Sequence, residues 1–514
     1  MQSNMGQSLE RVNNGDAMNR YGQQGSPKGD TTHHISHATW SLKVVFSLLA
    51  TLGLLFVTAA SSAAVKPTAL DAYVHAPDNH YHYEFIQETH HAGYTLYLLQ
   101  MTSQKWRSSS EVNRTLWQHW ITIYRPSQVK STTGMLLITG YSNDGHRPDP
   151  DVDPMLVSLA TLSHSVVAEV FDIPNQPLTF TNDTHGPRSE DEIIAYTWKK
   201  YLTTGDATWL ARLPMTKAAV RAMDTVTSFM ATAKGGNLAV NYFVVAGASK
   251  RGWTTWTTAA VDHRVVAIIP MVIDLLNVVP SFNHHYRCYG FWSPAVKDYW
   301  DIGLMDQLNT PGYQTMMSVI DPYSYRKRYT MPKLIINAAG DPFFVPDSSR
   351  FYFNHLPGEK YLRYMPNADH SLDGTDVDEN ITAFYLSIIE NLRRPQFRWK
   401  FEHNGDIRVT TRDQPISVKL WQATNPVHRD FRLEWVGPIY KSSVLLPAEP
   451  GVYVGHVIKP QKGWTALFVE LVFPGPKDYP FHFTTAVRVL PDTNPYPAPM
   501  PGEARLGSDP TPPK

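Results

Sequence analysis

Strand-like and helix-like stretches alternate between about residue 69 and residue 395, and this alternation constrains the fold more than any other feature. Aliphatic runs such as Met135–Thr139 and Val265–Val272 are typical of buried strands. Stretches that read as helices, Glu190–Leu202 and Met215–Thr232, separate such runs. Strands that alternate with helices usually form a mainly parallel sheet with helices on its faces. We therefore predict an α/β domain over residues 69–395.

Two stretches of this region depart from the simple alternation. Tyr81–Glu88 and Tyr94–Met101 flank the turn at His91–Gly93, so we predict an antiparallel hairpin there. Asp274–Met331 is long and rich in Tyr, Trp and Pro, and it interrupts the strand–helix pattern. We expect this segment to form a lid or one wall of a substrate pocket, because long ordered insertions commonly carry function.

After Pro395 the pattern changes to closely spaced strands without helical periodicity. Turn residues recur at short intervals, as in His403–Asp406, and we predict a small β-sandwich over residues 396–490. Residues 491–514 are rich in proline, and we expect them to be disordered. The segments expected to be strands are FRWKFEHNGDIRVTT, ISVKLWQAT, FRLEWVG, VYVGHVI, TALFVELVF and FHFTTAVRVL.

The hexapeptide Gly247–Gly252 (GASKRG) directly follows the strand Asn241–Val245 and opens a helix. A strand–turn–helix elbow exposes a serine beside a helix N-terminus, whose free N–H groups and positive potential stabilise a developing anion. The bend demands small residues, and two of them precede the serine. The pattern departs from Gly-x-Ser-x-Gly because Gly252 comes one place late. We predict Ser249 as a nucleophile and the backbone N–H of Lys250 as an oxyanion donor.

The predicted base and acid follow the last two strands of the α/β region. His370 lies just past the strand Tyr361–Tyr364, where a base can face the elbow. The chain order nucleophile, acid, histidine is usual for this arrangement. Asp341 is our first choice of acid because it leaves the end of the penultimate strand directly. Asp347 is the second choice, and Asp274, which follows the strand before, is the third.

Two further assignments concern the surroundings of the elbow. The loop Gly140–Gly145 follows a predicted strand, and we expect the backbone N–H of Tyr141 to be the second oxyanion donor. Lys250 and Arg251 either bind an anionic group of the substrate or pair with nearby carboxylates, and the sequence leaves both open. Pairing with carboxylates is the commoner fate of such residues.

Composition and histidine spacing limit the other functions. Lys+Arg and Asp+Glu both number 46, so the formal net charge is zero, which argues against a nucleic-acid partner. The sequence has neither a P-loop nor a dinucleotide-binding fingerprint, and we predict no cofactor. No Asp, Glu or Cys with ligand spacing accompanies the clustered histidines, so we predict no metal site. These histidines are His80, His82, His90, His91, His284 and His285.

The N-terminal region predicts export. Residues 1–43 are polar, and we expect a disordered tail. Residues 44–64 combine an apolar run, Val44–Ala60, with the small residues Ser61–Ala64, which indicates a signal peptide or a signal anchor. As a helix the apolar run would span roughly 26 Å, against about 30 Å for a hydrocarbon core. We predict a secreted protein or, alternatively, a single-pass membrane protein anchored through residues 44–60 with its body outside the cytoplasm.

The cysteine and the N-glycosylation sequons constrain the prediction only weakly. Cys288 is the only cysteine, so an intramolecular disulfide is excluded and a buried structural thiol is expected. Three N-glycosylation sequons begin at Asn113, Asn182 and Asn380 and give weak support to an exported glycoprotein.

Several long blocks, in order, resemble the PhoPQ-activated pathogenicity-related protein family, which includes autocrine proliferation repressor-like proteins. The resemblance spans roughly Asp71–Tyr479. It implies an exported α/β-hydrolase domain followed by a β-rich domain, and it supports Ser249, Asp341 and His370 as a catalytic triad. The elbow also resembles that of glucuronoyl esterases, which act on sugar-acid esters, but the family itself fixes no substrate. The blocks are GASKRGWTTWTTAAVDHRVVAIIPMVID, YGFWSPAVKDY, DPYSYRKR, PKLIINAAGDPFFVPDSSRFY and LPGEKYLRYMPNADHSL.

Three functions remain open from the sequence. The first is a serine hydrolase that forms an acyl-enzyme on a small-molecule or peptide substrate, with an ester or a peptide bond cleaved. The second is a non-catalytic secreted signalling or virulence-related protein that binds a cell-surface partner with a hydrolase scaffold. The third is a carbohydrate or cell-wall binder, suggested by 14 Trp and 26 Tyr, although such counts more often reflect core packing. A nucleophile, acid and base in the correct order favour the first.

Overall fold

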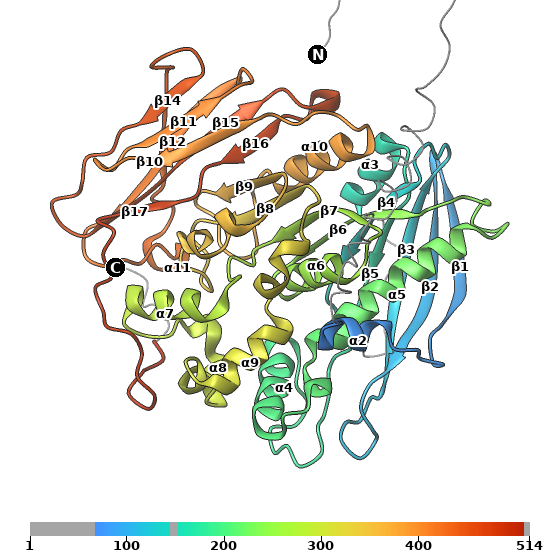
Figure 1. The fold of residues 1–514 in the computed structure, drawn as a ribbon. Coiled ribbons are helices and arrows are strands. Elements are labelled where there is room, and N and C mark those ends of the chain that lie inside the picture. Colours follow the sequence, from blue (N-terminus) through green and yellow to red (C-terminus); the bar gives the residue numbers. More distant parts are fainter. Residues whose placement is uncertain (1–66, 144–152, 508–514) are drawn as a thin grey trace, which may run out of the picture. The chain divides into compact units, whose positions relative to one another are not determined.

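The computed structural model describes residues 67–143 and 153–507. A large twisted sheet with helices on both faces dominates Figure 1. Its strands β5, β4, β6, β7, β8 and β9 are parallel in that spatial order, and the antiparallel strands β3, β2 and β1 extend one edge. The strands are β1 (His82–His91), β2 (Tyr94–Lys105), β3 (Leu116–Pro126), β4 (Thr133–Ile138), β5 (Val167–Val170), β6 (Tyr242–Ala248), β7 (Val265–Met271), β8 (Lys333–Ala338) and β9 (Lys360–Met365). This is the α/β-hydrolase fold, as predicted, and the expected β1–β2 hairpin is present.

Helices cover both faces of the sheet because each carries an apolar side. Helices α5 and α6 pack in one hydrophobic core, and α3 and α10 pack in the other. Helix α5 begins at Arg212, so Pro214 lies inside its first turn rather than before it. The helices are α2 (Ala69–His75), α3 (Pro154–Ser163), α4 (Glu190–Thr204), α5 (Arg212–Met230), α6 (Lys250–Val261), α7 (Val278–Tyr289), α8 (Lys297–Asp301), α9 (Pro311–Ile320), α10 (Val377–Ile389) and α11 (Leu433–Val436).

The C-terminal strands form two layers, and one of them continues the main sheet. Strand β16 pairs with β9 through Thr484 and Leu362, which joins β16, β15, β12 and β13 to the parallel strands. The sheet β10–β11–β14 forms the second layer, and Val409 shares a hydrophobic core with Leu420 and Val469. The predicted β-sandwich is therefore continuous with the α/β sheet. Its strands are β10 (Phe397–Phe401), β11 (Ile407–Thr411), β12 (Ser417–Asn425), β13 (Lys441–Val444), β14 (Val452–Gly455), β15 (Trp464–Phe473), β16 (Phe481–Thr484) and β17 (Arg488–Leu490).

Two predictions for the C-terminal region are wrong. The segment FRLEWVG was expected to be a strand, but Leu433–Val436 form the short helix α11. Residues 491–507 were expected to be disordered, but this stretch is bonded to the body of the protein. Asp492 forms an ion pair with Arg350 at 2.9 Å, and the carbonyl of Arg505 accepts the N–H of Trp292 at 2.8 Å. Residues 508–514 lie outside the described part.

The predictions for the N-terminus also lie outside the described residues, since these begin at residue 67. Within the described ranges, none of the helices is both long and apolar enough to cross a membrane. The sequons at Asn113 and Asn182 are exposed. Asn380 is only 2% exposed in α10 and donates to the carbonyl of Asp376 at 2.6 Å, so the glycosylation prediction does not hold for it in the folded chain.

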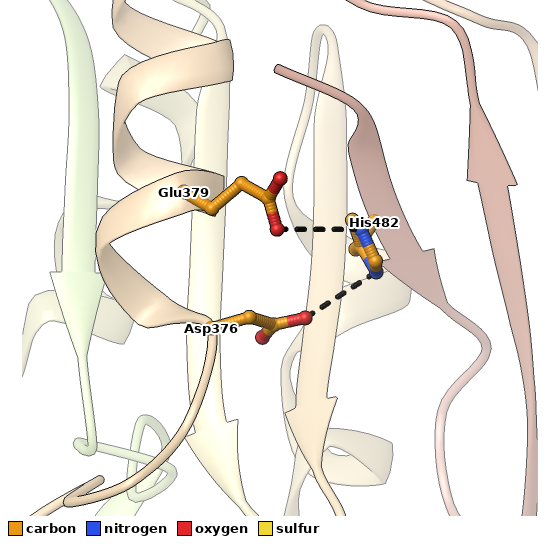
Figure 2. Close-up of side chains that lie close together, drawn as sticks. All are labelled: Asp376, Glu379 and His482. Carbon is orange, nitrogen blue, oxygen red and sulfur yellow. Dashed lines mark ion pairs between the residues drawn. The ribbon is translucent and has the colours of Figure 1, made fainter. Parts of the chain in front are cut away.

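An ion network joins α10 to the C-terminal strands. Figure 2 shows Asp376 and Glu379 projecting from the start of α10 toward His482 on β16. Arg363 on β9 lies buried between Asp376, at 2.8 Å, and Glu470 on β15, at 2.7 Å. Burial alone would raise the pKa of Glu470, but the hydrogen bond to His482 and the charge of Arg363 lower it to about 2. The network therefore stabilises the junction while Glu470 is ionised.

Replacing Glu470 with Gln should destabilise the protein in a pH-dependent way. Its folded-state pKa of about 2 lies below the ordinary value of 4.5, so its contribution is complete above about pH 4.5 and disappears as the pH falls toward 2. We expect Glu470→Gln to lower the free energy of unfolding by about 1–3 kcal/mol at pH 7 and by much less near pH 3. Urea unfolding at both pH values measures this, with the exposed Glu449→Gln as control. An equal loss at both pH values would contradict the assignment.

Candidate active site

Ser249 occupies a strained bend between β6 and α6. Its backbone has φ 56° and ψ −125°, a conformation that residues with a side chain rarely adopt. Its N–H donates to the carbonyl of Met271 on β7 at 2.8 Å, and its carbonyl accepts the N–H of Trp253 at 3.0 Å. The serine is thus fixed between the carboxyl end of a central strand and the first turn of a helix.

Two glycines explain why the bend can form. A Cβ atom on Gly247 would lie 2.8 Å from the carbonyl oxygen of Arg251. A Cβ atom on Gly252 would lie 2.9 Å from the carbonyl oxygen of Met271 and 3.0 Å from that of Gly247. Helix α6 therefore approaches β6 and β7 too closely for a side chain at either position. Gly252, which departs from the Gly-x-Ser-x-Gly spacing, is therefore required by the close contact between α6 and β7.

His370 and Asp341 are brought together at the same edge of the sheet. Asp341 follows β8 and His370 follows β9, and His370 Nδ1 lies 2.8 Å from Asp341 Oδ2. The other carboxylate oxygen accepts the N–H of Phe343 at 2.8 Å. Because Nδ1 faces a carboxylate, it carries the proton, which leaves Nε2 as an acceptor in the neutral ring. Nε2 is buried and has no hydrogen-bond partner among the described residues.

A small cavity lies beside the serine, and two of its wall residues contact the histidine. It has a volume of about 30 Å³ and is bordered by Ser249, Phe343 and Phe344. The rings of Phe343 and Phe344 also contact the ring of His370, with centroids 4.4 and 6.0 Å away. In the described chain no hydrogen bond joins Ser249 Oγ to His370. Catalytic hydrogen bonds are often long in ligand-free structures and tighten only with substrate bound.

Asp347, the second choice of acid, belongs to another cluster. Its carboxylate is buried and accepts from Arg429 at 2.7 Å and from His284 at 3.0 Å. Burial opposes its ionisation, but Arg429 and His284 hold the pKa of Asp347 well below its usual range. Cys288 lies in the same cluster as a buried free thiol, as expected, with its sulfur 2.8 Å from Arg429. Asp347 is thus committed to a structural network.

Asp274, the third choice, is also bonded elsewhere. Its two carboxylate oxygens accept the hydroxyl groups of Tyr352 at 2.7 Å and Tyr364 at 2.6 Å. Complete burial raises the pKa of Asp274 to about 7. Of the three candidate acids, Asp341 is therefore the one whose carboxylate reaches His370.

Lys250 and Arg251 pair with carboxylates at the start of α4. Lys250 Nζ lies 2.8 Å from Glu190 and 3.0 Å from Asp191, and Arg251 contacts both oxygens of Glu190 at 2.6 and 2.7 Å. Burial opposes the ionisation of Glu190, but Arg251 and Lys250 lower its pKa to about 2. The commoner of the two fates left open by the sequence is thus the one observed. These pairs tie the elbow to α4.

The loop after β4 lies beside the first turn of α6. A Cβ atom on Gly140 would lie only 2.5 Å from the guanidinium of Arg251, so the loop passes close to that side chain. Tyr141 has a positive φ of 92°, and its carbonyl accepts the side-chain amide of Gln176 at 3.0 Å. Its side chain is 72% exposed. The first N–H groups of α6, including that of Lys250, lack acceptors within the helix.

Arg212 is a residue of this site that the sequence analysis missed. It starts α5, is 3% exposed, and borders the same cavity as Ser249. Its Nη1 donates to the carbonyl of Lys250 at 3.0 Å, and its guanidinium lies 4.3 Å from the ring centre of Trp253. The local sequence LARLPM gave no signal of this, because the position next to the serine arises only when α5 and α6 pack together. The segment predicted as a pocket wall does border the cavity, through Leu275, Phe282, Val296 and Tyr299.

The groups closest to a metal-binding arrangement lie away from this cavity. In the part of the chain that is described, ligand atoms of Asp376, Glu379 and His482 lie within 4.8 Å of one another (Figure 2). Arg363, however, donates to both oxygens of Asp376 at 2.9 and 2.8 Å. Since a guanidinium already neutralises this carboxylate, we interpret the group as an ion network.

Larger cavities lie elsewhere. One of about 700 Å³ is bordered by Arg350, Trp399 and Arg488, between β10 and β17, and it includes neither Ser249 nor His370. The smaller cavity at the elbow is the one that combines a strained serine with rings contacting the histidine. We therefore treat the smaller cavity as the candidate active site.

The sequence is similar to a known protein family and to a named relative. A model of the family described as PhoPQ-activated pathogenicity-related protein matches residues 70–432. Autocrine proliferation repressor protein A of Dictyostelium discoideum is 38% identical over 464 residues, which cover 84% of this chain and 92% of that protein.

Solved structures resemble part of this chain at low sequence identity. An acetyl xylan esterase from Paenibacillus sp. R4 is 15% identical, with a TM-score of 0.43 over 63% of this chain and 92% of that one. Acetyl xylan esterase 1 from Thermoanaerobacterium sp. JW/SL YS485 gives the same identity and TM-score, over 63% and 94% of the chains. A glucuronoyl esterase from Solibacter usitatus is 13% identical, with a TM-score of 0.35 over 61% and 86%.

Replacing Glu190 with Gln should loosen the elbow. Lys250 and Arg251 are largely buried, and removal of a shared carboxylate leaves them poorly neutralised. We expect Glu190→Gln to lower the free energy of unfolding by about 1–3 kcal/mol, measured by urea denaturation. The exposed Glu503→Gln serves as control. If both variants unfold like the parent protein, the pairs at the start of α4 do not hold the elbow.

Proposed function

We propose that this chain, which belongs to the PhoPQ-activated pathogenicity-related protein family, is an exported serine hydrolase that cleaves an ester or a peptide bond. The observation that carries the proposal is the His370–Asp341 pair, whose unpartnered Nε2 is buried against rings that border the cavity of Ser249. The hydrolase scaffold is common to the fold, whereas the serine mechanism rests on this local arrangement.

In the proposed reaction Ser249 Oγ attacks the substrate carbonyl while its proton passes to His370 Nε2. Asp341 keeps the imidazole oriented through Nδ1 and stabilises the imidazolium that forms. His370 then gives the proton to the leaving group as the acyl-enzyme forms. A water molecule, deprotonated by the same nitrogen, hydrolyses the acyl-enzyme and regenerates Ser249. Each step uses one base, alternately accepting and donating a proton.

The backbone N–H of Lys250 and that of Tyr141 are the proposed oxyanion donors. Lys250 supplies a free N–H at the start of α6, where the helix dipole adds positive potential. Gly140 brings the Tyr141 loop against Arg251, and the hydrogen bond from Gln176 fixes the Tyr141 carbonyl. Losing one such donor typically costs about 3–4 kcal/mol of transition-state stabilisation.

Export is the second part of the proposal. Residues 44–64 carry the apolar run and the small residues that a signal peptide or anchor requires. The described body contains no helix suited to crossing a membrane, so residues 44–60 are the proposed anchor if one is retained.

A fluorophosphonate probe tests the serine mechanism. We expect the full-length protein to be labelled at Ser249, as located by mass spectrometry, and Ser249→Ala to remain unlabelled. Asp341→Asn should slow labelling by roughly 10³-fold or more, because His370 then loses the correct tautomer. Ser371→Ala, an exposed serine next to the histidine, is the matched control and should react like the parent protein.

Absence of labelling, or equal labelling of Ser249→Ala, would favour the alternative of a non-catalytic secreted protein on a hydrolase scaffold. The name of the Dictyostelium relative describes repression of proliferation and does not distinguish an enzyme from a ligand. A panel of short-chain esters, uronate esters and dipeptidyl amides then separates the substrate classes of a labelled protein.

A further inference from the structure

The guanidinium of Arg212 is buried beside the nucleophile without a carboxylate partner. The described chain places no carboxylate within ion-pair distance of it, and its Nε has no hydrogen-bond partner. A buried cation is normally paired, because taking a charge out of water is costly. The hydrogen bonds to the Lys250 carbonyl and to Tyr299, the stacking on Trp253 and the charge of Asp191 compensate only part of that cost, because burial still lowers the pKa of Arg212.

The carboxylate that borders the cavity is already bonded to other groups. Asp191 borders the same cavity, but its two oxygens bind Lys250 at 3.0 Å and the hydroxyl of Tyr299 at 2.8 Å. The charged residues that border the cavity are thus two cations, Arg212 and Lys250, and one carboxylate, Asp191. Lys250 shares a second carboxylate, Glu190, with Arg251. The cavity therefore holds one positive charge more than its own walls neutralise.

The other residues that border the cavity strengthen any ion pair that Arg212 forms there. They are mainly aromatic and aliphatic, so the local dielectric constant is low and an ion pair formed there is strong. The volume of about 30 Å³ corresponds to about two water molecules, which suits a small planar anion. Guanidinium groups bind carboxylates through their N–H donors, and the Nε of Arg212 is a buried donor without a partner. The apolar wall residues are Trp198, Trp253, Ile273, Leu275, Phe282, Val296, Phe343 and Phe344.

We propose that Arg212 binds a carboxylate of the substrate, so that the enzyme cleaves an ester or amide bond located beside a free acid group. The inference rests on the proposed serine hydrolase function, because it places the carboxylate in the cavity that Ser249 borders. Arg212 is then a specificity-determining residue, and Lys250 and Arg251, which are neutralised by α4, do not take that role.

Whether small carboxylic acids protect Ser249 from the fluorophosphonate probe tests carboxylate binding by Arg212. Acetate and propionate should slow labelling of the full-length protein at least about 10-fold at saturation, whereas acetamide and propionamide, at matched ionic strength, should have little effect. Arg212→Met should abolish the protection by the acids. Arg212→Lys, which keeps the charge but loses the paired donors, should retain part of it. Arg221→Met, on the same helix but paired with Asp224, is the matched control.

Comparing an ester that carries a free acid with its neutral methyl ester then shows how carboxylate binding affects turnover. We expect kcat/KM for mono-4-nitrophenyl glutarate to exceed that for its neutral methyl ester by about 10–100-fold, the range expected for a hydrogen bond to a charged group. Arg212→Met should bring the ratio to about one, because it lowers the rate for the acid far more than the rate for the methyl ester. A purely structural role of Arg212 would instead lower both rates by the same factor and leave the ratio unchanged.

The outcomes separate the two proposals. If Ser249 is labelled but acids and amides protect equally in the parent protein, carboxylate recognition is overturned and the hydrolase proposal stands. If Ser249 is never labelled, the hydrolase proposal fails and this inference fails with it. Because the comparison of acids with amides uses the parent protein, it decides the question even if the Arg212 variants do not fold.

Discussion

The left-handed backbone of Ser249 is the constraint on which the rest of the site depends. Such a conformation costs about 1–3 kcal/mol and persists only where its surroundings enforce it. Here the Met271 carbonyl holds the Ser249 N–H, and Gly247 and Gly252 let α6 lie against the sheet. The ion pairs of Glu190 anchor the following residues. Strain at the serine is thus balanced by packing and charge in elements that have no direct part in the proposed chemistry.

The charges around the elbow serve two different purposes. Lys250 and Arg251 bind carboxylates of α4 and fix the first turn of α6. Arg212 comes from α5, has no such partner, and borders the cavity. Neutralised cations and a cation without a carboxylate partner therefore lie beside the same serine. This difference, rather than the number of basic residues, is what suggests an acidic substrate.

The sequence predicts local features well and long-range contacts poorly. Ser249, Asp341 and His370 could be proposed because parallel strands end at one edge and the order of the three residues is usual. The continuity of the two sheets could not, since it depends on the pairing of Thr484 with Leu362. The short helix at Leu433–Val436 and the bonded stretch 491–507 likewise arise from tertiary contacts that override local pattern. Arg212 was missed because the lack of a partner is visible only in three dimensions.

The central claim is that the Ser249 hydroxyl attacks a substrate carbonyl while the His370 imidazole takes its proton. A crystal structure of the phosphonylated protein tests it most directly. We expect the phosphonyl group on Ser249 Oγ, with its free oxygen about 2.7–3.1 Å from the backbone nitrogens of Lys250 and Tyr141 and with His370 Nε2 facing the adduct. An adduct turned away from both nitrogens, or an imidazole out of reach of it, would contradict the claim.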